Sequence, residues 1–286
     1  MSGSLATATA AASRAASVTL AAPAPIYRPP RPAAADLALR ITVPLALLLL
    51  WAIGSATGAI PPTVLASPAA VFEAGAQMTA SGALWAHLSV SLARAGAGLL
   101  LGGGFGLLLG LAAGLSRTGE ALIDPSIQMI RALPFLALIP LFIVWFGIGE
   151  TSKLLLIASA AAKPMYLNAY SGVRNVDPKL VEAARVFGLG RARLIVELYL
   201  PSAIPSLMVG LRLAMTMSLI ALIAVEVINT SRGLGFVMLQ AQEFFKTDVL
   251  VVCMVLYAVF GLGTDLFVRG LERLLTPWRA GKAPAI

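Results

Sequence analysis

The sequence predicts an all-α membrane protein with six transmembrane helices, and two observations support this. The 286-residue chain is 59% hydrophobic and only 12% charged, with a mean hydropathy of +0.89. Soluble domains carry about 25% charged residues. Six apolar runs also approach the roughly 20 residues that span a bilayer. They cover residues 41–60, 90–114, 126–147, 152–170, 206–228 and 249–269.

The segments around these runs divide the rest of the chain. Residues 1–40, rich in Ala, Ser and Pro, are expected to form a disordered cytoplasmic tail, although their composition also fits an organellar transit peptide. Residues 61–88 are predicted to be a periplasmic linker, in which Ser67-Pro68 starts an interfacial helix. Residues 89–272 would form a core of five spans with a long loop at 171–204, and residues 273–286 a second cytoplasmic tail.

Basic residues in the connections predict the orientation. Fourteen Lys and Arg residues fall in the N-terminal tail, the 115–125 turn, the 171–204 loop and the C-terminal tail, whereas three fall in the opposite connections. Cytoplasmic loops carry the excess of positive charge. Both termini and the long loop are therefore expected to be cytoplasmic, in a multi-pass protein of the bacterial inner membrane.

Several functional classes are disfavoured by the sequence. It contains no P-loop pattern and no nucleophile elbow, so we predict no catalytic residue and no ATP site in this chain. Cys253 and His87 each stand alone, so no metal site or bound cofactor is predicted. Basic residues do not alternate with aromatics along a stripe, which argues against nucleic-acid binding.

The loop at 171–204 is a charged, amphipathic segment in an otherwise apolar chain. Asp177-Pro178 suits a helix start, because Asp caps helices and Pro fits the first turn. Apolar residues then fall on one face at helical spacing, and Gly188 and Gly190 allow a tight turn. A second short helix is predicted to end at Pro201. Two short helices around a glycine turn would form a docking element.

This segment resembles the EAA loop of ABC importer permeases. The matching residues are Glu182, Ala183, Ala184, Gly188, Leu200 and Pro201, followed by Gly210-Leu211-Arg212 and Ala214, with Leu198 where Ile is usual. The resemblance implies that Glu182 contacts an ATPase subunit, that the two alanines keep this surface flat and that Gly188 supplies the turn. An ordinary amphipathic loop is the alternative.

Residues 114–150, 173–188 and 243–266 resemble permeases of the aliphatic sulfonate, taurine and nitrate branch, the sulfonate permeases most of all. The resemblance implies a type I ABC importer permease fold. The implied partners are a second copy of the chain, two cytoplasmic ATPase subunits, and a periplasmic solute-binding protein. Import of taurine, nitrate or another small solute is the nearest alternative. An ATP-independent secondary transporter and a membrane-embedded enzyme are alternatives from other classes.

Charges and prolines inside the spans are candidates for a translocation path. Pro134 and Pro140 are expected to break the third span, and broken helices often line a cavity, with a packed kink as the alternative. Lys163 departs from the family pattern and could meet an anion, or it could reach the headgroups instead. Arg131 is a further candidate for the path that could also reach the headgroups, as could Arg212 and Arg94. Two further features are Glu226, expected at the outer interface, and glycines from Gly102 to Gly114 that favour close or sliding helix packing.

Overall fold

The computed structural model describes residues 33–277, in which every regular element is a helix. Residues 1–32 and 278–286, which make up most of the two predicted tails, lie outside the described residues. The chain divides between Leu50 and Trp51 into two units, which we describe separately. Helix α2 (Ala33–Ala56) crosses this division.

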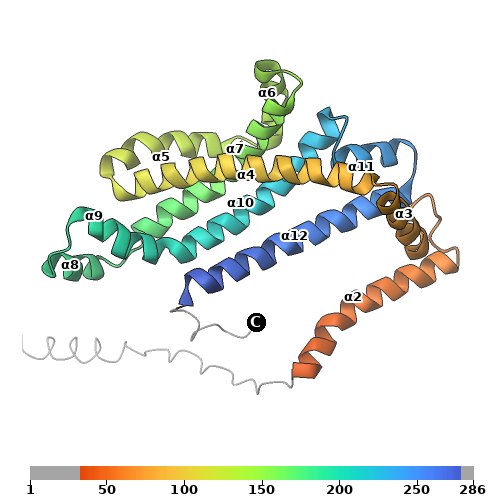
Figure 1. The fold of residues 1–286 in the computed structure, drawn as a ribbon, viewed down its shortest axis with the longest axis horizontal. Coiled ribbons are helices and arrows are strands. Elements are labelled where there is room, and N and C mark those ends of the chain that lie inside the picture. Colours follow the sequence, from red (N-terminus) through yellow and green to blue (C-terminus); the bar gives the residue numbers. More distant parts are fainter. Residues whose placement is uncertain (1–32, 278–286) are drawn as a thin grey trace, which may run out of the picture. The chain divides into compact units, whose positions relative to one another are not determined.

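The second unit contains all the remaining helices (Figure 1). They are α3 (Pro68–Ala80), α4 (Ala83–Leu115), α5 (Arg117–Ala132), the 3-10 helix η1 (Phe135–Leu138), α6 (Ile139–Phe146), α7 (Glu150–Arg174), α8 (Pro178–Val186), α9 (Arg191–Arg193), the π-helix η2 (Leu194–Tyr199), α10 (Leu200–Asn229), α11 (Leu234–Glu243) and α12 (Thr247–Leu275).

Helix α2 starts earlier than the predicted span 41–60. Its first turns lie in residues 33–40, which were predicted to belong to the disordered tail. This stretch, AAADLALR, is rich in Ala and Leu, the strongest helix formers, so it extends the apolar helix backward. The helix ends at Ala56, before Gly58 at φ +73.

Helix α3 confirms the cap predicted for the linker. The Ser67 side chain accepts a hydrogen bond from the Ala70 amide at 3.2 Å, and Pro68 occupies the first turn. A capping hydroxyl satisfies one amide that lacks an intrahelical partner, while proline loses nothing there.

One face of α4 consists of glycines that pack directly on α7. Gly98, Gly102, Gly106, Gly110 and Gly114 recur at every fourth position. A Cβ on Gly102 would lie 1.9 Å from the Ala158 carbonyl oxygen, and one on Gly106 would lie 2.3 Å from that of Ala162. The missing side chains therefore let the two backbones touch. Close packing, one of the two roles predicted for these glycines, is confirmed.

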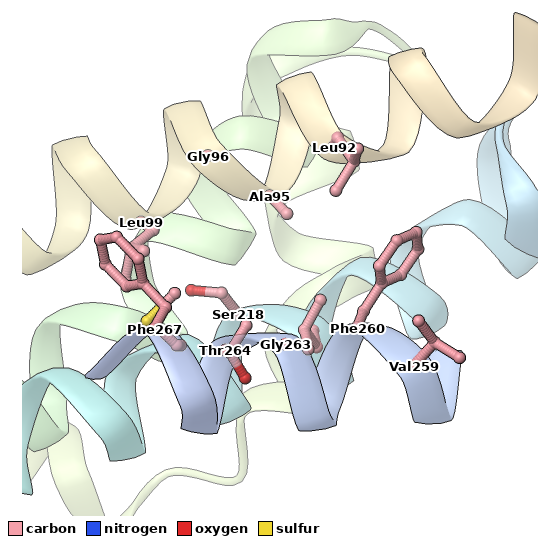
Figure 2. Close-up of a pocket in the computed structure, with 12 residues that line it drawn as sticks. Leu92, Ala95, Gly96, Leu99, Ser218, Val259, Phe260, Gly263, Thr264 and Phe267 are labelled. Carbon is pink, nitrogen blue, oxygen red and sulfur yellow. The ribbon is translucent and has the colours of Figure 1, made fainter. Parts of the chain in front are cut away.

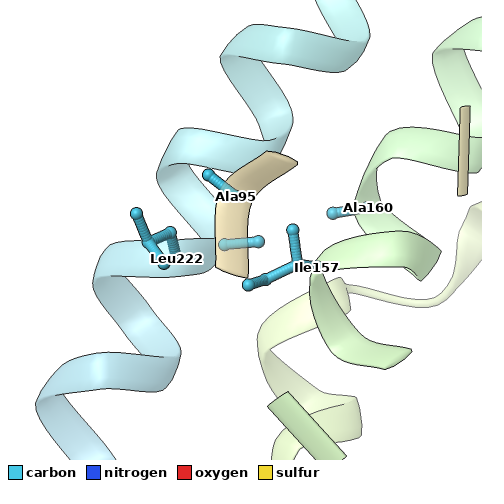
Figure 3. Close-up of a cluster of buried hydrophobic side chains, with 5 residues drawn as sticks. Ala95, Ile157, Ala160 and Leu222 are labelled. Atoms are coloured by element: carbon cyan, nitrogen blue, oxygen red, sulfur yellow. The ribbon is translucent and has the colours of Figure 1, made fainter. Parts of the chain in front are cut away.

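The core lies where α4, α7 and α10 meet. Ala95 of α4, Ile157 and Ala160 of α7 and Leu222 of α10 pack in one buried cluster (Figure 3). A second cluster joins Leu156 of α7 to Val225 of α10. Small residues from α4 and larger ones from α7 and α10 thus fill the same layer, which fixes the spacing of the three helices.

Three helices in the described part of the chain are long and apolar enough to cross a membrane. They are α4, the continuous helix Arg191–Ile228 and α12, which match the predicted spans 90–114, 206–228 and 249–269. Helix α5 and the η1–α6 segment would make a fourth if counted as one span bent by 91°, where 126–147 was predicted. The two other predicted spans fall in α2, whose apolar part is Ile41–Ala56, and in α7, which carries Lys153 and Lys163.

The α4–α7 contact predicts that substitutions at two nearby glycines of α4 differ in their effect on stability. Gly102→Ala should destabilise the protein by about 1–3 kcal/mol, because the methyl group collides with α7 backbone. Gly104→Ala is the matched control, since its Cβ would meet nothing within 4 Å. Thermal unfolding in detergent measures both. Equal melting temperatures for the two variants would contradict the contact.

Candidate functional site

The docking element begins as the sequence predicts. Asp177 caps α8, accepting a hydrogen bond from the Lys179 amide at 2.9 Å, and Pro178 is the first helical residue. Glu182 and Ala183 are exposed on α8, and Ala184 is partly buried. The carboxylate and the small residue beside it are therefore available to a partner.

Gly188 ends this helix in the left-handed region, at φ +79. Its amide and that of Phe187 donate to the Arg185 and Ala183 carbonyls. Gly190, the residue before α9, has a φ of −70, which lies outside the left-handed region. Only the first of the two predicted turn glycines therefore has a conformation that favours glycine.

The predicted helix end at Pro201 is wrong. Helix α10 begins at Leu200, and residues 191–228 run on as one continuous helix. The π-helix η2 lies directly before the proline, and the Leu200 amide donates to the Ile195 carbonyl, five residues back. A wider turn leaves room for the proline ring, which would otherwise collide with a carbonyl in the preceding turn. Pro201 therefore sits inside a helix that joins the docking element to the core.

Apolar side chains of the docking element point away from the rest of the chain. Val186 is 85% exposed and Phe187 83%, and Leu180 is also exposed. Two large apolar side chains beside a glycine turn are costly to leave in water. Together with Glu182 they form a surface suited to a protein partner.

The predicted path residues are only partly brought together. Pro134 stands at the break between α5 and η1, as expected, and Lys163 Nζ donates to the adjacent Leu133 carbonyl at 3.2 Å. Pro140 does not break a helix, because it lies in the first turn of α6, where proline is tolerated. Arg131 is exposed in the last turn of α5.

An apolar pocket of about 400 Å³ lies between α4, α10 and α12 (Figure 2). Leu92, Leu99, Phe260 and Phe267 contribute to its lining. Its two hydroxyl groups are already committed, since Ser218 donates to the Ala214 carbonyl and Thr264 to the Gly261 carbonyl. This pocket therefore offers no hydroxyl donor to an anion.

Among the residues that the structure describes, the most highly charged buried site is formed by Arg94 and Glu226, which were predicted to lie near the outer interface. Arg94 of α4 is only 6% exposed and Glu226 of α10 is 0% exposed, so neither reaches headgroups or the interface. Arg94 Nη1 lies 2.8 Å from Glu226 Oε1. Its Nη2 and Nε bond both carboxylate oxygens of Glu150, at 2.6 and 2.7 Å. A buried charge requires such a partner, because burial removes its hydration.

Glu226 also holds the loop between α10 and α11. It accepts hydrogen bonds from Ser91 at 2.8 Å and from the Gly235 amide at 2.9 Å. Arg94 donates to the Arg232 carbonyl at 2.6 Å. A Cβ on Gly233 would lie 2.3 Å from Glu226 Oε1, so a side chain there would displace the carboxylate. Four described segments thus meet at one ion pair.

Glu150 connects this site to solvent. Its side chain is 57% exposed, and Lys153 Nζ lies 3.0 Å away. The hydrogen bond from Arg94 lowers the pKa of the Glu150 carboxyl from 4.5 to about 2, despite partial burial. The Glu150 carboxylate therefore stays ionised at neutral pH, and the stabilising effect of its bonds is lost only as the pH falls from about 4.5 towards 2.

Arg212 was also expected to reach the headgroups, but it pairs within the protein. It lies 3.2 Å from Asp265 and 3.5 Å from Glu272, both on α12. A lone charge within an apolar run was the available signal for Arg94, Arg212 and Glu226. That signal shows that burying the charge is energetically costly, but it does not identify the residue that pairs with it.

The buried pair predicts a large cost for removing one charge. Arg94→Met should lower the free energy of unfolding by about 3–5 kcal/mol, because it leaves Glu226 buried without a counter-charge. The double variant Arg94→Met/Glu226→Gln should recover part of the loss. Arg269→Met is the control, since it removes an exposed pair with Asp265 worth about 0.2–1 kcal/mol. Comparable losses in Arg94→Met and Arg269→Met would contradict this role.

Comparison with known proteins confirms the family resemblance of the sequence. Residues 102–277 match the family described as the binding-protein-dependent transport system inner membrane component. The chain is 44% identical to the SsuC permease of Escherichia coli, named for aliphatic sulfonates transport, over 82% of this chain and 90% of the relative. It is 39% identical to the SsuC of Bacillus subtilis, over 84% and 87%.

The chain is also 38% identical to the taurine transport system permease TauC of Escherichia coli, over 81% of this chain and 86% of the relative. Among solved structures, the MetNI methionine ABC transporter is similar at 22% identity with a TM-score of 0.47, covering 65% of this chain and 93% of the other. The chain therefore belongs to the family of inner membrane components of binding-protein-dependent transport systems, as the non-catalytic permease of an ABC importer.

Proposed function

We propose that this permease imports aliphatic sulfonates. The observation that carries the proposal is its identity of 44% and 39% to two SsuC permeases over more than four fifths of the chain. Taurine, itself a sulfonate, is the second candidate, supported by the 38% identity to TauC.

The proposed assembly has six spans per chain, with α2 and α7 as the first and fourth. Two copies of the chain would bind two cytoplasmic ATPase subunits and one periplasmic solute-binding protein. Both termini and α8 would face the cytoplasm, as the distribution of Lys and Arg supports. A single docking element per chain supports a homodimer, because each ATPase subunit needs one.

In this proposal, α8 carries the energy of ATP into the membrane. Glu182 would make polar contacts with the ATPase, and Val186 and Phe187 would be buried against it. ATP binding would close the ATPases and move α8. Because residues 191–228 form one helix, movement of the docking element would reach the α4–α7–α10 core directly. The two permease halves would then open alternately to each side.

ATP-dependent uptake tests the proposal. The permease, its ATPase subunits and the binding protein would be reconstituted in liposomes, and uptake of an alkanesulfonate measured with and without ATP. Taurine and nitrate serve as comparison solutes. We expect uptake of the alkanesulfonate only with ATP. Uptake without ATP would instead support a secondary transporter. Uptake of taurine or nitrate but not of the alkanesulfonate would make that solute the substrate in place of aliphatic sulfonates.

The matched variants Gly188→Val and Gly190→Val extend this test to the docking element. Gly188→Val should abolish coupled uptake, since a non-glycine residue in the left-handed region costs about 1–2 kcal/mol and distorts the turn. Gly190→Val should retain uptake, because φ −70 suits any residue. Normal uptake and ATPase co-purification in Gly188→Val would argue against this role for the turn.

We also propose that Lys163 meets the anion near the break in the third span. Its ammonium pairs with a neutral carbonyl, that of Leu133, so its charge is not neutralised by that bond. Pro134 follows directly, and Arg131 on the preceding turn adds positive charge. An anion moving past this break would be attracted to Lys163.

Lys163→Met should therefore raise the KM for sulfonate uptake roughly tenfold or more, as expected for a charged hydrogen bond worth about 1.5–3 kcal/mol. Lys163→Arg should keep most of the affinity. Lys246→Met, which makes the same charge change on an exposed turn, is the control. Unchanged uptake kinetics in Lys163→Met would rule out contact with the anion.

A further inference from the structure

Helix α5 is attached to the core differently from its neighbours. It contains no buried residue, and its backbone does not pack closely along α7. Long polar side chains make the connection to α7 instead, while the first turn of α5 packs on α4, where a Cβ on Gly119 would lie 2.4 Å from the Ala112 carbonyl oxygen. Tyr166 donates to Asp124 at 2.9 Å, Tyr170 donates to Glu120, and Arg174 lies 3.1 Å from Glu120.

These contacts stand in a row along α7. Tyr166 and Tyr170 are one helical turn apart, with their rings stacked at 6.1 Å and 8°. Arg174, one further turn along, is the last residue of α7. Because residues four apart share a helix face, the three side chains present one polar edge to α5. We name Glu120, Tyr170 and Arg174 the α5–α7 joint.

The joint lies next to the docking element in the chain. Helix α8 starts at Pro178, only a short turn after Arg174. A displacement of α8 would therefore also act on the end of α7 that holds Glu120. The opposite end of α5 leads into Leu133 and Pro134, where the chain bends by 91° and Lys163 holds the Leu133 carbonyl.

From this arrangement we infer that α5 is a strut that transmits movement of α8 to the bend at Leu133. Glu120, Tyr170 and Arg174 act as positioning residues, and the bend changes the path beside Lys163. The inference rests on the proposed coupling role of α8. The joint suits this role because its ion pair is partly exposed, at 45% for Arg174 and 29% for Glu120. Such pairs contribute little to stability and can rearrange.

Distance measurements test the strut without any solute. Spin labels would be attached at exposed positions on α5 and α6, through Met129→Cys and Val144→Cys in a Cys253→Ser background. In the complex with the ATPase subunits, ATP should change the distance between the labels. Glu120→Gln and Arg174→Gln should abolish this change while the ATPase still co-purifies and hydrolyses ATP. The swap Glu120→Arg/Arg174→Glu should restore it.

Transport provides the second measurement. The amount of alkanesulfonate moved per ATP should fall about five- to tenfold in Glu120→Gln, within the usual range of coupling between sites. Asp265→Asn, which weakens the α10–α12 ion pairs, is the control and should keep the ratio. An ATP-induced distance change that persists in Glu120→Gln, or that is absent from the wild type, would overturn the strut. Failure of alkanesulfonate uptake alone, with the distance change intact, would overturn only the proposed substrate.

Discussion

The structure depends on burying Glu226. A carboxylate with no exposed surface needs a counter-charge and hydrogen-bond donors, and Arg94, Ser91 and the Gly235 amide supply them. Arg94 in turn requires Glu150, which recruits Lys153. These two acids and two bases balance in charge. Because they come from α4, α7 and α10, the ends of the three helices cannot separate without exposing an unpaired buried charge.

Helices α4, α7 and α10 are also joined along their length by close packing of backbone and apolar side chains. The glycine face of α4 brings its backbone against α7, and Ile157 and Leu222 fill the layer shared with α10. Helices α5 and α12 also carry partly exposed ion pairs to these helices, Glu120–Arg174 and Arg212–Asp265, beside the buried Val252, Cys253 and Val268 of α12. Close packing and a buried pair make one body of the first set.

What could be predicted from the sequence was mostly local. The cap at Asp177, the turn at Gly188 and the packing glycines of α4 each depend on residues a few positions apart. Pro201 was misinterpreted, since a π-turn in the preceding residues admits a proline that an α-helix would reject. The Arg94–Glu226 pair joins residues 132 positions apart, so no spacing pattern could reveal it. Helix α7 carries Glu150 and Lys153 of this bonding, and it is not among the helices apolar enough to count as a span, although 152–170 was predicted to be one.

Charge pairing also limits where an anionic solute can be attracted. Arg94 and Lys153 are neutralised by Glu150 and Glu226, and Arg212 by Asp265 and Glu272. Their fields at a distance are largely cancelled, so they serve the fold. Lys163 differs, because its hydrogen-bond partner at the bend between α5 and η1 is the neutral Leu133 carbonyl and not a carboxylate. A charge without a counter-charge inside a membrane protein is costly for the fold, and this cost is the physical basis of the proposed contact between Lys163 and an anion.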